Sequence, residues 1–222
     1  MSDDILNPKD IILFKQDQMW KQISTLKIFI NFLKYSKQKK PFRFSFVDKE
    51  GLLLNNLTLR ENILLDSISN SLTSSKESQL KNKLKSLDNE YLNSLFLKLD
   101  FLDELPTKVD SQTCKIAALI KSMIQNTDYI FLNEPDHHLD SRKVKLLQRA
   151  LLLHTKNNNQ TIFISSGQQE RWVKHATKIV TRGPLGEFII TPPVKKFNII
   201  DQIEITDGHL NIYNNKEIKK SA

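Results

Sequence analysis

The chain has 222 residues, 39% of them hydrophobic and 26% charged, a balance typical of a globular domain with a core. Only five residues are glycine, and no two of them have the spacing of G-x-x-x-x-G-K or G-x-G-x-x-G, so both glycine-rich phosphate loops are excluded. The net charge of +8 favours an anionic partner, although lysine-rich proteins without such a partner share it.

Hydrophobic periodicity divides the first half of the chain into strands and helices. The expected elements are a strand at residues 10–14, a helix at 20–35, a strand at 42–47, a helix at 58–72 and one or two helices within 74–105. Thr58 and Glu61 have the spacing of a capping box at the start of their helix. Pro106 is expected to end the helical region.

The second half alternates short apolar runs with amphipathic segments. The expected elements are a helix at 111–125, strands at 129–132, 161–164 and 178–181, helices at 140–153 and 169–175, and a strand-like region at 188–213. Strands that are apolar throughout and alternate with helices are typical of a parallel sheet. The sequence therefore predicts an α/β fold.

Residues 126–140 read NTDYIFLNEPDHHLD. They resemble the Walker B strand, catalytic glutamate and D-loop of ABC-type ATPases, whose usual form is a hydrophobic run followed by D-E-P-x-x-x-L-D. Three further segments match in the same order: Ser24-Thr25-Leu26 after the first strand, LTLRENI at 57–63, and Leu105-Pro106 with the helix that follows. The resemblance covers residues 10–190 and is strongest to the subgroup that energises lipoprotein-release, macrolide-export and cell-division permeases.

The resemblance implies an ABC ATPase-like parallel sheet core with an α-helical subdomain and a small C-terminal β appendage. We expect the ATPase-like domain to span residues 1–190, with the helical subdomain at about 58–125, and the appendage to span 191–222. The single cysteine, Cys114, suits a reducing cytosol, and no run of 18 apolar residues is present to cross a membrane.

The sequence departs from the family at each phosphate-contacting motif. The P-loop position is filled by Asp17–Gln22, which contains no glycine, and the lysine position holds Ile23. Glycine is the residue that lets a backbone wrap closely around phosphate. The signature position, Val109–Thr113, also lacks glycine, and Asp110 brings a negative charge to it. The switch histidine is replaced at Ser166-Gly167, and the Q-loop glutamine, expected near Asp48-Lys49, is missing.

A few residues of the family's nucleotide site remain. Glu134 keeps the position of the catalytic base, and we interpret it as vestigial and structural. Ser24, Thr25, Asn133 and Asp140 are vestigial counterparts of nucleotide and Mg²⁺ contacts, with Asn133 lacking the carboxylate that Mg²⁺ prefers. No cofactor and no metal are expected. His137 and His138 are expected to form a solvated turn, because consecutive side chains diverge.

The resemblance therefore indicates a non-catalytic, pseudo-ATPase subunit that docks on a permease-like integral membrane protein. An intact ABC ATPase subunit or a second copy of the chain is a further possible partner. The chain would then be cytoplasmic and peripheral to the inner face of the membrane. The residues expected to bind the partner are Asp48, Lys49, Leu52, Leu53, Leu54, Leu57 and Arg60. The leucines among them could equally belong to the core.

Two alternatives remain open at this point. A divergent but active ATPase would use ATP and Mg²⁺ at Glu134, Asp140, Ser24 and Thr25. A basic nucleic-acid-binding module would use the lysine-rich stretches at 34–43 and 76–85, with phenylalanines beside the first to stack on bases. We expect no nucleic-acid partner, because a solvated basic face beside core phenylalanines explains the same pattern.

Overall fold

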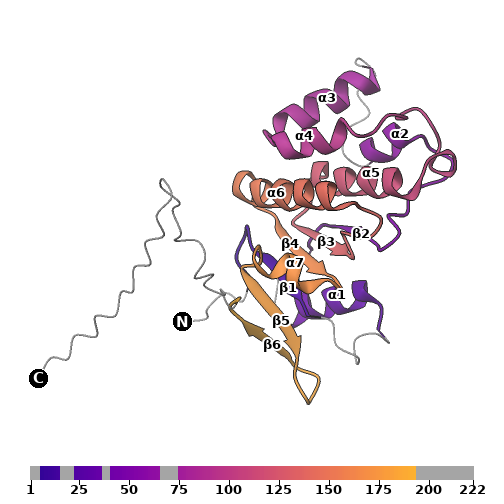
Figure 1. Cartoon of the computed structure of the whole chain (residues 1–222). Coiled ribbons are helices and arrows are strands. Elements are labelled where there is room, and N and C mark those ends of the chain that lie inside the picture. The colour runs from indigo at the N-terminus through magenta and orange to yellow at the C-terminus, as the bar shows by residue number, and fades with distance from the viewer. Residues whose placement is uncertain (1–5, 16–22, 37–40, 66–74, 194–222) are drawn as a thin grey trace, which may run out of the picture.

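The computed structural model describes residues 6–15, 23–36, 41–65 and 75–193, which form a six-stranded sheet with helices on both faces (Figure 1). The strands are β1 (Ile11–Phe14), β2 (Phe44–Val47), β3 (Tyr129–Asn133), β4 (Thr161–Ser165), β5 (Lys178–Arg182) and β6 (Phe188–Thr191). Their order across the sheet is β2-β3-β4-β1-β5-β6. Every pair from β2 to β5 is parallel, and β6 pairs antiparallel with β5. The predicted α/β class with a parallel sheet is confirmed.

Helices connect the strands within the described ranges. They are α1 (Thr25–Tyr35), α2 (Leu59–Leu64), α3 (Lys76–Ser86), α4 (Glu90–Phe96), α5 (Ser111–Ile124), α6 (Ser141–Asn157) and α7 (Gln169–Val173), with a 3-10 turn at Pro106–Lys108. The predicted capping box at α2 is confirmed: the Thr58 side chain accepts the Glu61 N–H at 3.2 Å, and the Glu61 carboxylate accepts the Thr58 N–H at 3.0 Å.

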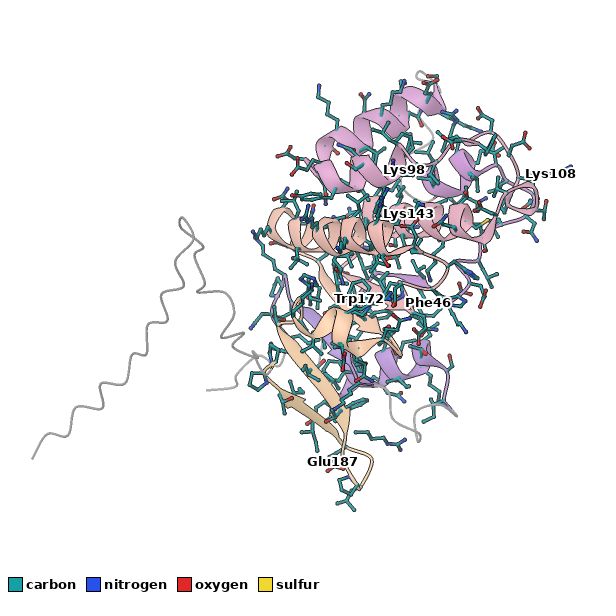
Figure 2. All side chains as sticks on the ribbon, in the orientation of Figure 1. Phe46, Lys98, Lys108, Lys143, Trp172 and Glu187 are labelled. Carbon is teal, nitrogen blue, oxygen red and sulfur yellow. The ribbon has the colours of Figure 1, made fainter. Side chains whose placement is uncertain are left out.

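Side chains that alternate along the strands build one core on each face of the sheet. In β1, Ile11 and Leu13 belong to the core that α2–α7 cover, whereas Ile12 and Phe14 belong to the core that α1 covers. Successive residues of a strand point to opposite faces, so a strand buried on both faces is apolar throughout. Trp172 of α7 is buried in the first of these cores (Figure 2).

The core beneath α1 is aromatic. The ring of Phe14 meets those of Phe29 and Phe32 edge-on, with centroids 5.0 and 5.1 Å apart, and Phe131 meets Phe163 in the same way at 5.0 Å. Each such pair stabilises the fold by about 1 kcal/mol beyond its buried area. Helix α1 is thereby fixed to the sheet, and with it the position of Ser24 and Thr25 at its start.

The long helical region predicted at 74–105 is two helices in the structure. They are separated at Leu87–Asn89, where Asp88 has a φ of 47°, a conformation that interrupts a right-handed helix. Asn89 then caps α4: its side chain accepts the Leu92 N–H at 3.0 Å and donates to the Ala150 carbonyl at 2.8 Å. The second contact ties α4 to α6.

Two other predictions are only partly covered by the structure. The beginning of the predicted helix 20–35 and the end of the predicted helix 58–72 lie outside the described residues. The strand-like region predicted at 188–213 contains β6, and its remainder from residue 194 onward lies outside them too. Among the helices that the structure describes, none combines the length and the apolar character needed to span a bilayer.

Candidate functional site at the carboxyl edge of the sheet

The parallel strands β1, β3 and β4 end side by side, and we call the place where they end the carboxyl edge. Phe14 at the end of β1 pairs with Ser165 of β4, which also pairs with Asn133 of β3. Ligands of open α/β sheets bind outside this edge, because the loops that follow the strands converge there. The segments that leave it are residues 15–25, 133–140 and 166–168.

The segment after β1 leads to Ser24 and Thr25, which the sequence predicts to be vestigial nucleotide contacts. The predicted P-loop position, Asp17–Gln22, lies outside the described residues. Ile23, at the lysine position, is partly buried and packs against the aromatic core under α1. Ser24 is exposed and precedes α1 without forming a side-chain cap, and Thr25 begins the helix half-buried. The hydroxyl of Ser24 is therefore accessible to solvent. The residue before it, Ile23, has no positive charge to bind a phosphate.

The segment after β3 begins with Asn133 and Glu134. Glu134 has a φ of 47°, and its carboxylate accepts the backbone N–H of Gly167 through both oxygens, at 2.9 and 3.1 Å. Its own N–H donates to the Ser165 carbonyl at 2.7 Å. These contacts join the turn after β3 to the loop after β4. The carboxylate at the family's catalytic position thus has a defined structural contact.

Asp136, which sequence reasoning did not single out, holds the same turn in place. It is buried, and one of its oxygens accepts the Ser166 hydroxyl at 2.9 Å and the Trp172 indole N–H at 3.3 Å. The guanidinium of Arg171 lies 3.7 Å from the other oxygen. No local pattern marks this residue, because all of its partners lie about 30 residues further along the chain.

The acidic residues Asp110 and Asp140 cap helices. Asp110 accepts the Thr113 N–H at 2.6 Å at the start of α5, and this hydrogen bond is the main reason that its pKa is lowered. Asp140 accepts the Arg142 and Lys143 N–H groups at 2.9 Å each at the start of α6. The ammonium of Lys143 also contacts Asp140 and is the main cause of its lowered pKa. Both carboxylates supply negative charge to helix N-termini, where it is favourable.

Lys115 of α5 is a buried cation that sequence reasoning also missed. Its side chain is fully buried, and its ammonium donates to the carbonyls of Asp48, Lys49 and Asn133 at 2.6, 3.0 and 3.4 Å. Burial lowers its pKa to about 8. A signal was present in the sequence, since Lys115 lies one turn before Leu119 on the apolar stripe of its helix.

The expected partner-binding segment follows β2. Leu52 and Leu54 are 77% and 49% exposed, whereas Leu53, which stands between them in the sequence, packs against the core. Two of these three leucines therefore lie on the surface and one contributes to the core. Asp48 accepts the Leu52 N–H at 2.9 Å. Leu57 is half-buried.

Two further residues fix this segment to the helices. Asn62 is fully buried, accepts the Leu54 N–H at 2.8 Å, and donates to the Leu54, Leu57 and Thr58 carbonyls at 3.0 Å each. Arg60 forms a bidentate ion pair with Asp103, with both contacts at 2.9 Å. The segment that carries the exposed leucines is therefore fixed to the rest of the fold by several hydrogen bonds and an ion pair.

The prediction that His137 and His138 diverge is wrong. Their ring centroids are 4.0 Å apart, and both rings face Glu50. The reason is the backbone of His138, whose φ of 66° turns the chain back so that neighbouring side chains converge.

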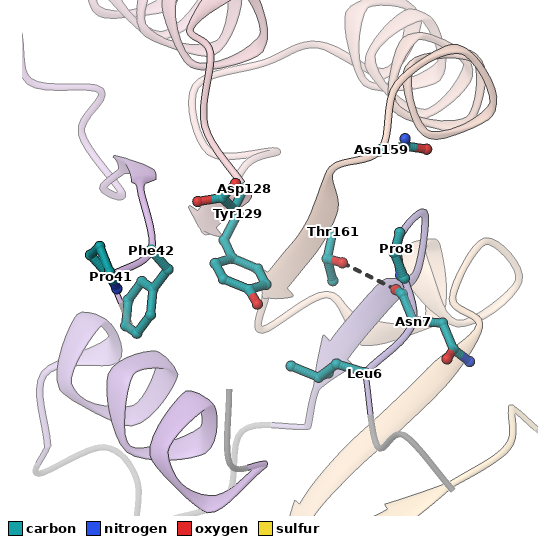
Figure 3. Close-up of a pocket in the computed structure, with 9 residues that line it drawn as sticks. All are labelled: Leu6, Asn7, Pro8, Pro41, Phe42, Asp128, Tyr129, Asn159 and Thr161. Atoms are coloured by element: carbon teal, nitrogen blue, oxygen red, sulfur yellow. Dashed lines mark hydrogen bonds between the residues drawn. The ribbon is translucent and has the colours of Figure 1, made fainter. Parts of the chain in front are cut away.

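A hollow of about 310 Å³ lies away from all of these residues (Figure 3). It is lined by residues that precede the strands or begin them, among them Asn7, Asp128 and Thr161, and the Thr161 hydroxyl donates to the Asn7 carbonyl at 3.1 Å. This hollow lies at the amino edge of the sheet, opposite the sequence-predicted site.

Solved structures of ATP-binding cassettes share this fold. An inward-facing metal-chelate type ABC transporter superposes with a TM-score of 0.60 and 16% identity over 85% of this chain and 75% of that one. The ATP-binding subunit of an ABC transporter gives a TM-score of 0.60 and 15% identity over 79% and 75%. A dimeric cassette bound to ADP and phosphate gives a TM-score of 0.60 and 16% identity over 79% and 83%. No family model and no curated protein matches the sequence.

The fold is thus that of an ABC-type ATPase domain, as the motifs at 24–26, 57–63 and 126–140 predicted. The placement in the lipoprotein-release subgroup stays a prediction.

Proposed function

We propose that the chain is a non-catalytic ABC-type subunit that docks on a permease-like integral membrane protein at the cytoplasmic face of the membrane. The observation that carries this proposal is the contact of the Glu134 carboxylate with the Gly167 N–H. A general base must be within hydrogen-bond reach of the water that it activates. Here both oxygens of that carboxylate share the backbone N–H of Gly167, which directs the carboxylate toward the loop after β4.

The neighbouring positions support the same conclusion. Ile23 packs into the aromatic core where the family has a lysine on the phosphates, and Asn133 has no charge for Mg²⁺. Asp110 occupies the start of α5, where the family's signature loop meets the phosphate of a facing subunit. One lost transition-state contact costs about 3 kcal/mol, so losses at several positions leave little catalysis.

The exposed leucines support the docking half of the proposal. Leu52 and Leu54 lie in the segment that the family uses to grip the coupling helix of a permease, and their side chains face solvent. The segment is fixed from behind by Lys115 and Asn62. An apolar surface on a rigid support loses little conformational entropy on binding. A permease helix with apolar side chains is the partner that this surface fits best.

A partner cassette is the second candidate for binding. Two of the similar solved structures are dimers of a bacterial cassette, and the same fold would allow this chain to pair with an intact ATPase subunit or with itself. With an intact partner, one of the two shared nucleotide sites would lack the P-loop and the other would lack the signature, and a homodimer of this chain would have the altered motifs on both sides.

Capture from detergent-solubilised membranes tests the proposal. The full chain is cross-linked to its partners in its native cells and then purified. We expect mass spectrometry to identify an integral membrane protein among the recovered proteins, with or without an ATPase subunit. The capture should be lost when Leu52 and Leu54 are both changed to Asp. Recovery of neither kind of protein would contradict the docking half of the proposal. ATP hydrolysis that Glu134→Gln abolishes would instead show a divergent, active ATPase.

A further inference from the structure

Glu50, His137 and His138 place three potential metal ligands together on the surface of the molecule. The Nε2 atom of His138 lies 2.9 Å from one carboxylate oxygen of Glu50, and Nε2 of His137 lies 3.6 Å from the other. One ligand atom from each residue falls within 4.8 Å of both others. The cluster joins two segments 87 residues apart, since Glu50 follows β2 and the histidines follow β3.

The backbone on both sides of the cluster is well fixed. On the histidine side, the His137 N–H donates to the Glu134 carbonyl at 3.0 Å, and the positive φ of His138 brings the two rings to the same side of the turn. On the glutamate side, Lys115 holds the carbonyls of Asp48 and Lys49, immediately before Glu50. A site that exists before binding does not have to be ordered by the ligand.

Gly51 explains how Glu50 comes so close to α5. Its φ is 69°, and a Cβ atom on it would lie 2.8 Å from the Cα of Lys115. Only glycine allows the chain to turn at this point against the helix. The turn directs the Glu50 side chain toward the histidines of the neighbouring segment.

The donor set and its spacing fit zinc. Zn²⁺ is bound by histidine nitrogen and carboxylate oxygen at about 2.0–2.2 Å, so two ligands of a tetrahedral ion lie about 3.3 Å apart. The two oxygens of Glu50 lie 2.9 Å from His138 and 3.6 Å from His137, close to that value, and one ligand atom from each residue lies within 4.8 Å of the other two. The partial exposure of all three residues leaves a fourth position for water.

The charges around the cluster have opposing effects on a cation. Glu50 contributes the negative charge, and its pKa is lowered chiefly by the hydrogen bond with His138. Partial burial lowers the pKa of His137, and the positive charges of His138 and Lys49 beside it act in the same direction. Lys49 and Lys115 repel a cation, which limits the affinity but does not block the ligand atoms.

We propose that Glu50, His137 and His138 form a Zn²⁺ site that links the segment after β2 to the turn after β3. The ion replaces the hydrogen bond between Glu50 and His138 with coordination to both histidines and the carboxylate. The site requires no nucleotide and no partner, so it stands independently of the function proposed above.

Zinc titration of the tag-free full chain, by calorimetry and by competition with a chromogenic chelator, tests the site. We expect one Zn²⁺ ion per chain, and an affinity that falls at least about tenfold in each of Glu50→Gln, His137→Gln and His138→Asn. Asparagine is chosen at position 138 because it tolerates positive φ. Two variants away from the cluster, Glu90→Gln and His175→Gln, should bind as the unmodified chain does.

Two further readouts separate coordination from folding. Zn²⁺ should raise the melting temperature of the unmodified chain and of the two control variants, but not that of Glu50→Gln, whose exposed side chain can be changed without loss of fold. Co²⁺ in place of zinc should give the visible absorption of a tetrahedral site. Absence of stoichiometric binding, or equal affinity in the three cluster variants and the controls, would overturn the proposal.

Discussion

The carboxylate of Glu134 at the end of β3 and the backbone N–H of Gly167 after β4 are joined through both carboxylate oxygens, at 2.9 and 3.1 Å. The contact bridges the loops of two adjacent strands at the carboxyl edge of the sheet. The residue that the resemblance places at the catalytic position thus connects two loops of the fold. The positive φ of Glu134 is maintained by this contact and by its N–H bond to Ser165.

Replacing Glu134 with glutamine should reduce stability. The amide keeps one acceptor oxygen and loses the charge, so we expect the free energy of unfolding to fall by about 1 kcal/mol. Urea denaturation measures the change. Glu104→Gln, an exposed glutamate in the connection before Pro106, is the matched control and should leave the midpoint unchanged. A Glu134→Gln protein as stable as the unmodified chain would mean that the bridge contributes nothing.

Burial of Lys115 predicts a dependence of stability on alkaline pH. The acidic groups that face its ammonium, Asp48, Asp136, Glu50 and Glu134, raise the pKa, but burial outweighs them and lowers it from 10.5 to about 8. Between these two pH values the unfolded chain binds more protons at this group than the folded chain does. The contribution of Lys115 to stability therefore increases as pH rises from 8 to 10.5, and it stays at its lowest value below pH 8.

The comparison that isolates this effect is with Lys115→Met. The unmodified chain should gain up to about 3 kcal/mol relative to the variant over that pH window, at about 1.4 kcal/mol per pKa unit. Denaturation of both proteins at several pH values in the presence of a chelator measures the difference. Stability curves that run parallel from pH 8 to 10.5 would show that the pKa of Lys115 is not lowered.

Asn62 should be one of the most sensitive polar residues. Its buried amide makes four hydrogen bonds to the backbone of residues 54–58, and Asn62→Ala removes all of them. The Leu54 N–H and the Leu57 carbonyl lose this partner, whereas the Leu54 and Thr58 carbonyls still accept backbone N–H groups. We expect a loss of about 3 kcal/mol in the free energy of unfolding. Hydrogen exchange should show that the amide of Leu54 loses protection first. The exposed Asn55→Ala serves as control, and equal stability of the two variants would refute the assignment.

The proposed docking surface can be tested without affecting the fold. Leu52→Asp combined with Leu54→Asp places charge on two exposed side chains, so the melting temperature should change little while binding to the captured membrane partner falls at least tenfold. Leu97→Asp is a close control, because Leu97 is 76% exposed and lies on the surface after α4. Equal loss of binding in the control would indicate a non-specific apolar effect.

The sequence predicted the strands and helices well where the pattern is local. The apolar runs at 129–132 and 161–164 became β3 and β4, and the spacing of Thr58 and Glu61 gave the cap of α2. The cap of α5 was not predicted, although Asp110 stands directly before the predicted helix and aspartate is a strong N-cap. These features depend on residues within a few positions of one another.

Contacts between distant segments could not be predicted in the same way. Glu134 and Gly167 are 33 residues apart, and Asp136 and Trp172 are 36 apart. The convergence of His137 and His138 depends on the positive φ of His138, which is uncommon outside glycine, so the ordinary rule for neighbouring side chains failed. The contact of Asn89 with the Ala150 carbonyl of α6 likewise joins residues that are far apart in the chain.

Steady-state ATP hydrolysis by the full chain in the presence of Mg²⁺, compared with that of Glu134→Gln, is the most direct test of the central claim. The proposed non-catalytic role predicts that both proteins release phosphate at the same background rate. Turnover by the unmodified chain that disappears in Glu134→Gln, while the variant remains folded, would contradict it and identify Glu134 as a catalytic residue.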